Sequence, residues 1–483
     1  MDYEAVIGLE VHTQLITRSK MFCGCANDFG GEPNTRVCPV CLGYPGVLPT
    51  INREAVRKTV MAGLVCGCEV TGPSKFDRKN YFYPDMPKNY QLSQYDQPFC
   101  RGGGVALEAS AGFSGAPLSP RRIGLTRMHL EEDTGKLTHL ERCSAVDFNR
   151  AGVPLLEIVT DPDLRTADEA YAFLSALKQA MQYAGVSTCD MEKGQMRCDV
   201  NVSVRPRGQA AFGEKVEIKN LNSFRAVHRS LEYEIERQVA AVRAGQAIQQ
   251  ETRGWDDGTG ATFVQRTKEN AHDYRYFPEP DLMPLEITPA WVAEIAAGLP
   301  EAPVARRQRF VQQYGVSEYD AVVLTAERGS ADYFEAVARG CPNPKLAANW
   351  VTTELAGALA QAGLTLAQSP VPAAALAELV SLISAATLSG KMAKEVFAEM
   401  FRTAKSAQAI VSEKGLQQVT DSGAIGELAR QAIQASPGVV AEVRGGNTKA
   451  LQFLVGQVMK LSRGKANPQL AVQALKDELG RGR

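Results

Sequence analysis

The sequence predicts an α+β protein with a strand-rich first part and a helical second part. Before about residue 290, short stretches alternate apolar and polar residues and are separated by many Gly and Pro residues. After this point, Ala and Leu recur at the roughly 3.6-residue spacing of helices. The length of 483 residues fits roughly two to four domains.

The first predicted strand is IGLEVHTQL, residues 7–15. Ile7 and Leu9 share one face, whereas Glu10 and His12 project together from the other face. A carboxylate beside an imidazole fits either a solvated surface strand or a metal or phosphate site. The strand alone leaves both interpretations open.

Four cysteines form the clearest metal-ligand pattern. They occur as two close pairs, Cys23 with Cys25 and Cys38 with Cys41, separated by twelve residues. Such pairs predict a closed tetrahedral zinc site, in which four protein ligands leave no position for a substrate. The zinc would therefore be structural, and the alternative is four free thiols. The odd total of 11 cysteines indicates a reducing compartment and not a disulfide framework.

Two adjacent carboxylates, Glu131 and Glu132, follow a strand-like run and precede Asp133. Acidic residues of this kind often hold Mg²⁺ together with substrate phosphates. A charged turn would have the same sequence, so the motif by itself does not decide between the two interpretations.

A longer alternating strand is predicted over 197–205, RCDVNVSVR. One face is apolar, and the polar face carries Arg197, Asp199, Asn201, Ser203 and Arg205. Guanidinium groups beside a carboxylate and an amide suit nucleotide phosphates with a metal ion, although outer strands often have a polar face too. The stretch KVEIKN (215–220) repeats the design, with Lys219 in its polar row.

Two loop-like stretches, 75–96 and 272–285, mix basic residues with Tyr and Phe. Such mixtures can stack nucleic-acid bases and hold phosphates. Pro-rich loops can also be merely structural, so the composition supports both interpretations equally.

Helices are predicted over 168–185 and 226–245, and each stretch ends at a glycine. In the second part, 373–386 and 451–464 have clear helical periodicity. A further boundary near 405–410 leaves a last piece of about 75 residues, the size of a small helical bundle.

Composition and missing motifs exclude several classes of protein. No apolar run approaches the roughly 20 residues of a membrane span, and the N-terminus has no targeting pattern. The chain has no G-x-x-x-x-G-K-[ST] loop and no kinase motif set, so a site for ATP would need its own design.

The net charge is −1, but residues 421–483 hold 9 basic and 5 acidic groups. This excess fits nucleic-acid binding or a solvated helical surface.

Longer motifs occur in a fixed order along the chain: GLEVHTQL, CPVCLGYPGVLP, YFYPDMPKNYQLSQ, HLEEDTGK, DFNRAGVPLLEIVTDPD, RCDVNVSVRP, EIKNLNSF and DYRYFPEPDL. This ordered set closely resembles the B subunits of the glutamyl-tRNA(Gln)/aspartyl-tRNA(Asn) amidotransferases. The match continues through GKMAKEVFAEMF (390–401) and KALQFLVGQVMKLSRGKANP (449–468), so it covers essentially the whole chain.

The resemblance implies three parts. A cradle domain of antiparallel sheet and helices, residues 1–292, would hold the kinase and transamidase site and the zinc knuckle. A helical middle domain would span 293–408, and a C-terminal helical tail that binds tRNA would span 409–483.

The resemblance also implies a cytoplasmic, ATP-dependent ligase. The side-chain carboxylate of misacylated Glu-tRNA(Gln) or Asp-tRNA(Asn) would be phosphorylated, and ammonia would then displace the phosphate. A partner amidase (A) subunit would release the ammonia from glutamine, and a small C subunit would complete the heterotrimer.

Residues can be assigned to this reaction. By the resemblance, Mg²⁺ is expected in one cavity that is lined by Glu10, His12, Glu131, Glu132 and Asp199. The polar strand faces supply the expected ligands of ATP, namely Arg197, Asn201, Arg205 and Lys219. In the tail, tRNA is expected to contact Lys449, Lys460, Arg463 and Lys465. The buried side of the same helix would consist of Leu451, Leu454, Val455, Val458 and Met459.

Two other classes of function stay open at this point. A non-catalytic tRNA-binding scaffold would carry strand-face carboxylates without a metal, and its complex would consume no ATP with misacylated tRNA. A free-standing ATP-dependent amide ligase would need its own ammonia source, and the sequence has no glutaminase constellation. The sequence does not determine whether Glu-tRNA(Gln), Asp-tRNA(Asn) or both is the substrate.

Overall fold

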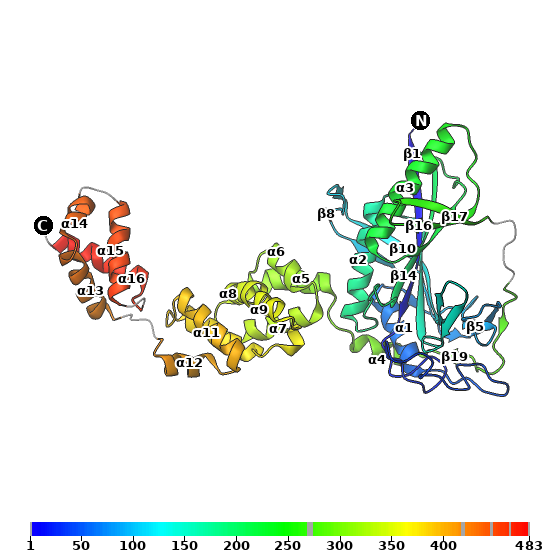
Figure 1. Ribbon diagram of the computed structural model, residues 1–483, viewed down its shortest axis with the longest axis horizontal. Coiled ribbons are helices and arrows are strands. Elements are labelled where there is room, and N and C mark those ends of the chain that lie inside the picture. Colours follow the sequence, from blue (N-terminus) through cyan, green and yellow to red (C-terminus); the bar gives the residue numbers. More distant parts are fainter. Residues whose placement is uncertain (1, 268–273, 417–420, 445–447, 463–464, 482–483) are drawn as a thin grey trace. The chain divides into compact units, whose positions relative to one another are not determined.

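The computed structural model describes residues 2–267, 274–416, 421–444, 448–462 and 465–481. The chain divides into two compact units, Met1–Ala302 and Pro303–Arg483. The first unit contains strands and helices, whereas the described residues of the second unit form helices (Figure 1). The α+β class predicted from the sequence is therefore confirmed.

The first unit is built on one large sheet with the strand order β17-β16-β15-β14-β1-β13-β10-β6-β2, and β7 also pairs with β10. Its strands are β1 (Tyr3–Gln14), β2 (Glu69–Val70), β6 (Cys100–Arg101), β7 (Gly104–Leu107), β10 (Arg121–Glu132), β13 (Pro154–Thr160), β14 (Met196–Pro206), β15 (Val216–Leu221), β16 (Glu251–Asp256) and β17 (Ala261–Thr267). Neighbouring strands are antiparallel except β15 and β16. This one parallel pair is joined by a helix, because parallel neighbours need a crossover connection.

β1 lies inside the sheet, and one of its faces is mainly apolar. Ile7, Leu9 and Val11 are buried, and Glu10 and His12 alternate with them and project from the opposite face. β1 pairs with β14 on one side and with β13 on the other. Its backbone N–H and C=O groups therefore find hydrogen-bond partners on both sides of the strand.

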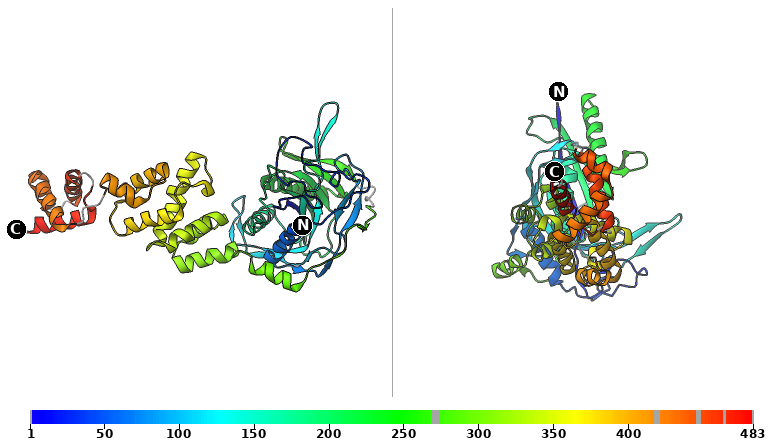
Figure 2. Two further views of the ribbon diagram at one scale, coloured as in Figure 1. Left: turned by 90° about the horizontal axis from the view of Figure 1, so that it is seen from below. Right: turned by 90° about the vertical axis from the view of Figure 1, so that its left-hand side faces the viewer.

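Three helices pack on the apolar face of the sheet (Figures 1 and 2): α1 (Arg53–Val65), α2 (Ala167–Tyr183) and α3 (Phe224–Arg243). Each helix begins after a side chain that accepts hydrogen bonds from its first backbone N–H groups, namely Asn52, Thr166 and Ser223. Their buried side chains join those of the strands in one hydrophobic core. The predicted helices at 168–185 and 226–245 are confirmed, with ends shifted by one or two residues.

β10 contains a bulge that exchanges its two faces. Its pairing with β13 shifts register between Leu125 and Arg127, which places one extra residue in the strand. Leu125 before the bulge and Met128 after it are both buried in the same core. The bulge therefore turns His129 and Glu131 toward the polar face of the sheet.

Shorter strands form four small sheets, β18-β4-β5, β11-β12, β19-β3 and β8-β9. Their bounds are Pro73–Ser74 (β3), Asp77–Asn80 (β4), Tyr90–Ser93 (β5), Ser110–Ala111 (β8), Pro117–Leu118 (β9), Lys136–His139 (β11), Ser144–Asp147 (β12), Phe277–Pro278 (β18) and Leu285–Glu286 (β19). The β18-β4-β5 sheet brings together the two aromatic stretches that are far apart in the sequence, 75–96 and the described part of 272–285, residues 274–285.

The second unit is helical in its described residues. Its helices are α5 (Pro303–Tyr314), α6 (Glu318–Leu324), α7 (Arg328–Arg339), α8 (Pro344–Asn349), α9 (Ala356–Ala362), α10 (Ala373–Ser384), α11 (Gly390–Thr403), α12 (Ala407–Lys414), α13 (Ser422–Gln434), α14 (Pro437–Arg444), α15 (Thr448–Leu461) and α16 (Pro468–Arg481). A π-helical turn, Trp350–Leu355, joins α8 to α9, and a 3-10 turn, Leu366–Gln368, precedes α10. The helical prediction at 373–386 is confirmed by α10, and the prediction at 451–464 is confirmed by α15 as far as Leu461, whereas residues 463–464 lie outside the described part of the chain.

The second unit contains two separate hydrophobic clusters. The buried residues of one cluster lie between Phe310 and Val411 in the sequence, and those of the other lie between Ile425 and Leu475. In the first unit, α4 (Pro289–Ala297) packs Ile295 into the core of the sheet. The finer division of the chain at residues 292 and 408 stays a prediction. No helix in the described part of the chain is long and apolar enough to cross a membrane.

Candidate active site

Neighbouring strands bring the candidate residues into rows on the polar face of the sheet. In the strand order β14-β1-β13-β10, His12 of β1 lies opposite Arg197 on one side and opposite Glu157 on the other. Glu157 in turn lies opposite His129 of β10. Because opposite residues on one face have Cβ atoms about 5 Å apart, side chains from four strands can touch one another.

The closest of these side chains form a carboxylate–histidine cluster, which consists of Glu10, His12, His129, Glu131 and Glu157. His12 Nε2 lies 3.3 Å from Glu157 Oε2, 3.6 Å from Glu10 Oε1 and 3.7 Å from Glu131 Oε1. His129 Nε2 lies 3.4 Å from Glu157 Oε2 and 3.8 Å from Glu131 Oε2. His129, Glu131 and Glu157 are buried, and Glu10 and His12 are half-buried.

Burial and neighbouring charges shift the pKa values of three residues in the cluster. Burial by itself would lower the pKa of His12, but its hydrogen bond with Glu157 and the nearby carboxylates raise it to about 9. Burial and the charge of Glu157 raise the pKa of Glu10. Burial would raise the pKa of Glu157 as well, yet the positive charges of His129 and His12 hold it well below its usual range. The cluster thus concentrates negative charge that protonated imidazoles or a cation must offset.

The geometry of the cluster suits a metal ion. Glu10, His12 and Glu157 each present one ligand atom, and these atoms lie within 4.8 Å of one another. His129, Glu131 and Glu157 do the same, so Glu157 belongs to both groups. The buried Nδ1 of His129 has no hydrogen-bond partner among the described residues. Because carboxylate oxygens are the protein ligands that Mg²⁺ prefers, these residues are the candidates for holding it.

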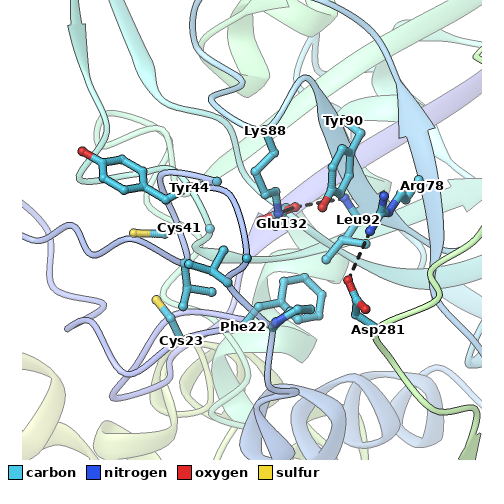
Figure 3. Close-up of a pocket in the computed structure, with 16 residues that line it drawn as sticks. Phe22, Cys23, Cys41, Tyr44, Arg78, Lys88, Tyr90, Leu92, Glu132 and Asp281 are labelled. Carbon is cyan, nitrogen blue, oxygen red and sulfur yellow. Dashed lines mark hydrogen bonds and ion pairs between the residues drawn. The ribbon is translucent and has the colours of Figure 1, made fainter.

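Glu132 does not join this cluster. It follows Glu131 on one strand, so its side chain projects from the opposite face of β10. Its carboxylate binds Lys88 and accepts the backbone N–H of Leu92 at 2.9 Å. With Phe22 and Lys88 it lines a cavity of about 220 Å³ (Figure 3). The expectation that all five predicted Mg²⁺ ligands share one cavity is therefore wrong for Glu132.

Asp199 lies beside the cluster. It is opposite Glu10 in the register of β14 and β1, and its carboxylate accepts a hydrogen bond from Lys219 Nζ at 2.9 Å. Lys219 also lies 3.2 Å from Glu217. Neither candidate metal group includes Asp199, so Asp199 and Lys219 form a charged pair that flanks the cluster on β14 and β15.

Two further residues predicted to bind a nucleotide share the polar face of β14. Arg197 donates from Nη2 to the buried carboxylate of Asp133 at 2.9 Å, and Gln14 donates to the same carboxylate at 2.8 Å. Asn201 lies two residues beyond Asp199, opposite Gly8 of β1. Both residues are therefore close to the cluster along the strand.

Arg205 is separated from the cluster. Because a strand rises about 3.3 Å per residue, Arg205 lies about 20 Å along β14 from Asp199. It forms an ion pair with Glu4 at 2.8 Å and lies over the ring of Phe212. The expected single row of nucleotide ligands therefore stops before Arg205, because alternation fixes the face of a residue but not its distance from the site.

The joined aromatic stretches lie next to the cluster. Tyr95 stacks on Tyr276 with ring centroids 4.5 Å apart. Burial would lower the pKa of Lys79, but the charges of Glu131 and Glu157 contribute to raising it. The β18-β4-β5 sheet therefore places a lysine and stacked rings at the border of the carboxylate–histidine cluster.

Sequence reasoning missed Glu157 and His129. Glu157 interrupts a run of apolar residues in β13, and this was the available signal, because a carboxylate is rarely buried without a partner. His129 is part of the HLEED motif, but simple alternation places it on the same face as Leu125. Only the bulge of β10 brings it to the polar face.

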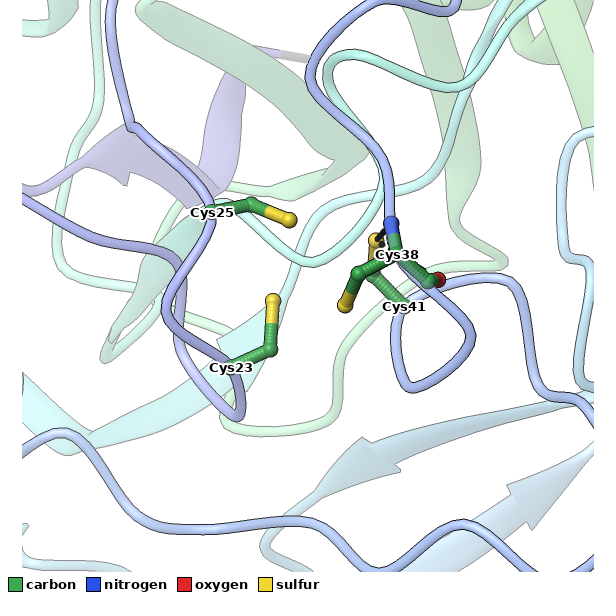
Figure 4. Close-up of side chains that lie close together, drawn as sticks. All are labelled: Cys23, Cys25, Cys38 and Cys41. Atoms are coloured by element: carbon green, nitrogen blue, oxygen red, sulfur yellow. Dashed lines mark hydrogen bonds between the residues drawn. The ribbon is translucent and has the colours of Figure 1, made fainter.

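The four cysteines converge as the sequence predicts. The Sγ atoms of Cys23, Cys25, Cys38 and Cys41 all lie within 4.8 Å of one another (Figure 4). Tetrahedral zinc with Zn–S bonds of about 2.3 Å needs sulfur atoms about 3.8 Å apart, so small movements suffice. Hydrogen bonding with Cys23 lowers the pKa of the Cys41 thiol to about 5, and the Cys38 backbone N–H at 3.2 Å adds to this. The set could bind a metal and is compatible with structural zinc.

The basic residues predicted to bind tRNA lie on and after α15, except that Arg463 lies outside the described residues. Lys449 and Lys460 are exposed, and their separation of 11 residues places them within about 20° of each other around the helix. Lys465 donates to the carbonyl of Gly415 at 2.9 Å. The predicted buried side of α15 is confirmed by Leu454, Val455 and Val458, with Leu451 and Met459 partly buried.

Comparison with models of protein families shows which family the chain belongs to. A family model described as the GatB/GatE catalytic domain matches residues 5–293, and a model described as the GatB domain matches residues 332–479. The chain belongs to the GatB/GatE family. The part that matches the catalytic domain contains β10, β13, β14 and β1 from Ala5 onward, and hence the whole carboxylate–histidine cluster.

Full-length relatives agree with this assignment. The chain is 52% identical to the B subunit of the aspartyl/glutamyl-tRNA(Asn/Gln) amidotransferase of Moorella thermoacetica, over 99% of this chain and 100% of the relative. It is 51% identical to the protein of the same description in Carboxydothermus hydrogenoformans, over 99% of each chain. The corresponding protein of Caldanaerobacter subterraneus subsp. tengcongensis is 51% identical over 100% of both chains. The family resemblance inferred from the ordered motifs is confirmed.

Proposed function

We propose that this chain is the component of a tRNA-dependent amidotransferase that uses ATP to phosphorylate the side-chain carboxylate of Glu-tRNA(Gln), Asp-tRNA(Asn) or both, and then forms the amide. A carboxylate oxygen attacks the γ-phosphorus of ATP, and ADP leaves. Ammonia then attacks the activated carbonyl carbon, and phosphate leaves with formation of Gln-tRNA(Gln) or Asn-tRNA(Asn). The first step is needed because a free carboxylate would have to expel oxide.

The observation that carries this proposal is the convergence of Glu10, His12, His129, Glu131 and Glu157 on one sheet face. When bound there, Mg²⁺ would neutralise charge on the transferring phosphoryl group. His12 would act as a ligand in its neutral form, so binding of the cation would release the proton that the surrounding carboxylates hold on the ring.

Basic side chains around the cluster would orient the substrates. Lys219 and Arg197 are held by Asp199 and Asp133, and they lie on the strands that border the cluster. Such restrained cations suit phosphate oxygens, since little side-chain entropy is lost when they bind. Lys79 would neutralise the substrate carboxylate or a phosphate on the other side of the cluster.

The remaining parts supply ammonia, tRNA and stability. Ammonia would come from a partner amidase (A) subunit, with a small C subunit completing a heterotrimer in the cytoplasm. Lys449 and Lys460 would contact tRNA phosphates. A structural Zn²⁺ bound by the four cysteines would hold the loop between Cys23 and Cys41 against the sheet.

The proposal is tested by ADP formation in the assembled complex without glutamine. The wild-type complex should form ADP when charged Glu-tRNA(Gln) or Asp-tRNA(Asn) is present and should form none when the charged tRNA is left out. Glu10→Gln should lower this rate at least about 100-fold, since charge stabilisation of phosphoryl transfer is lost. Glu4→Gln is the matched control, because Glu4 lies on the same strand and pairs with Arg205 away from the cluster. Equal ADP formation by the wild type, Glu10→Gln and Glu4→Gln would disprove the proposal.

A further inference from the structure

A completely buried lysine lies beside the four-cysteine site. Lys20 has an exposed fraction of 0% and is among the largest fully buried side chains of the chain. Its backbone N–H donates to the carbonyl of Cys25 at 2.9 Å. The lysine is therefore built into the same loop that carries the first cysteine pair.

The ammonium group of Lys20 points at the second cysteine pair. Its Nζ donates to Cys41 Sγ at 3.7 Å and to the carbonyl of Phe148 at 3.2 Å. Among the residues that the structure describes, no carboxylate oxygen lies within 4.0 Å of this nitrogen. A buried ammonium group is costly unless an anion accompanies it. Cys41 is the side chain that Lys20 Nζ contacts and that carries a negative charge once its thiol is ionised, as it is on binding a metal.

The charge of a zinc–thiolate site explains why a lysine would be buried there. A dication with four thiolates carries two net negative charges, and a site of this charge is itself costly to bury. Cys41 is the buried member of the four cysteines. Its sulfur already accepts the backbone N–H of Cys38 at 3.2 Å, so Lys20 adds a second donor and a positive charge to the same atom.

We propose that Lys20 is the charge partner of the metal-bound Cys41 thiolate, and that its buried ammonium group retains zinc in the four-cysteine site. The inference rests on the zinc site of the proposed function. Lys20 is a positioning residue, since it acts through the sulfur of Cys41 and not on the metal. Partners of this kind orient metal ligands and stabilise their charged form.

The proposal predicts a change in zinc retention when the charge is removed. Full-length chains of the wild type, Lys20→Met and Lys20→Gln are loaded with zinc, and transfer of the zinc to a chelator is followed. Both variants should bind zinc about 10–100-fold more weakly than the wild type, the usual cost of losing such a partner. Lys58→Met is the matched control. Lys58 is also buried, at 8% exposure, but its Nζ donates to the carbonyl of Gly185 at 2.6 Å.

A second readout separates charge from packing. With Co²⁺ in place of zinc, the thiolate-to-cobalt charge-transfer band should move to longer wavelength in both Lys20 variants, because loss of the ammonium group raises the energy of the sulfur electrons. Lys58→Met should leave the band unchanged. Lys20→Gln keeps an N–H donor on a side chain that is one atom shorter and has no charge, so it is the second test of the proposal if Lys20→Met does not fold.

Wild-type zinc retention and an unmoved band in the folded Lys20 variants would overturn the role of Lys20 while leaving the zinc site intact. A wild-type chain that binds no zinc after loading would overturn both the zinc site and the role of Lys20. The phosphorylation chemistry of the proposed function would stand in either case, because it is measured separately by ADP formation.

Discussion

The carboxylates of Glu131 and Glu132 are neighbours in the sequence and lie on opposite faces of β10. Glu131 faces the two imidazoles of the carboxylate–histidine cluster, whereas Glu132 binds Lys88 in a separate cavity. Two residues of one motif therefore have different surroundings, and the structure predicts different consequences when each is changed.

Glu131→Gln should weaken binding of a divalent cation by about 10–100-fold, because it removes a charged ligand from the cluster. Glu132→Gln should leave the affinity within about twofold of the wild type, because its carboxylate is on the other face. Mn²⁺ can report on the site as a substitute for Mg²⁺, and its binding to the full-length chain is measured by electron paramagnetic resonance. Equal losses in the two variants would show that the cluster as described is not the cation site.

Cys38→Ser should remove zinc from the chain and lower its resistance to denaturant, since a structural zinc site contributes directly to folding. Zinc content is measured by elemental analysis, and unfolding is followed by circular dichroism. Cys143→Ser is the matched control, because Cys143 is exposed and outside the four-cysteine set. Wild-type zinc content in Cys38→Ser would contradict the assignment.

Glu335 of α7 should make the stability of the helical unit sensitive to acid. Burial would raise the pKa of Glu335, but hydrogen bonds from Arg309 and Arg306 lower it to about 2. The folded value is below the ordinary 4.5, so this stabilisation is fully present above pH 4.5 and is lost as the pH falls toward 2. Glu335→Gln should cost about 2 kcal/mol at pH 7 and should reduce the loss of stability between pH 5 and pH 3.

The fluorescence of Trp350 measures this effect if Trp255 and Trp291 are replaced by Phe, since Trp350 packs in the core of the same helices. Glu399→Gln serves as the control. Glu399 also pairs with basic residues, Arg402 and Lys414, but at the surface, so its replacement should change stability little. An acid transition that is identical in the wild type and Glu335→Gln would rule out this role.

Lys449 and Lys460 should contribute salt-dependent affinity for tRNA. Replacing both by Ala should raise the KM for charged tRNA and reduce the slope of log affinity against log salt by about 1 to 2, since each phosphate contact releases counterions. Transamidation by the assembled complex is measured across salt concentrations. Lys405→Ala is the control, because Lys405 is exposed, lies outside α15 and forms an ion pair with Glu413. An unchanged slope in the double variant would exclude α15 as a tRNA-binding surface.

The local parts of the site could be predicted from the sequence. Cys23 and Cys25 lie in one short segment, as do Glu10 and His12, and alternation or close spacing is enough to bring such residues together. The buried face of α15 was predictable for the same reason, because helical spacing fixes which residues share a face.

The long-range parts of the site could not be predicted in this way. Glu157 meets His12 only through the register between β13 and β1, which tertiary packing sets. His129 reaches the cluster only because of the bulge in β10. For Arg205 the sequence predicted the correct face of β14, but the residue lies too far along the strand to reach the cluster. Alternation predicts on which face of a sheet a side chain lies. Its neighbours across the sheet depend on strand register and on bulges.

The central claim is that the carboxylate–histidine cluster catalyses phosphorylation of the substrate carboxylate, and Glu157 tests it most directly because it contacts both imidazoles. The assembled complex is given ATP and Glu-tRNA(Gln) or Asp-tRNA(Asn) without glutamine, and the activated carboxylate is trapped with hydroxylamine as a side-chain hydroxamate. Only this product is measured, after separation from the α-hydroxamate that hydroxylamine forms directly from the aminoacyl ester. The wild type should form the hydroxamate only with ATP, and Glu157→Gln should form it at least about 100-fold more slowly, with unchanged circular dichroism and tRNA binding. Hydroxamate formation at the wild-type rate by folded Glu157→Gln would contradict the account.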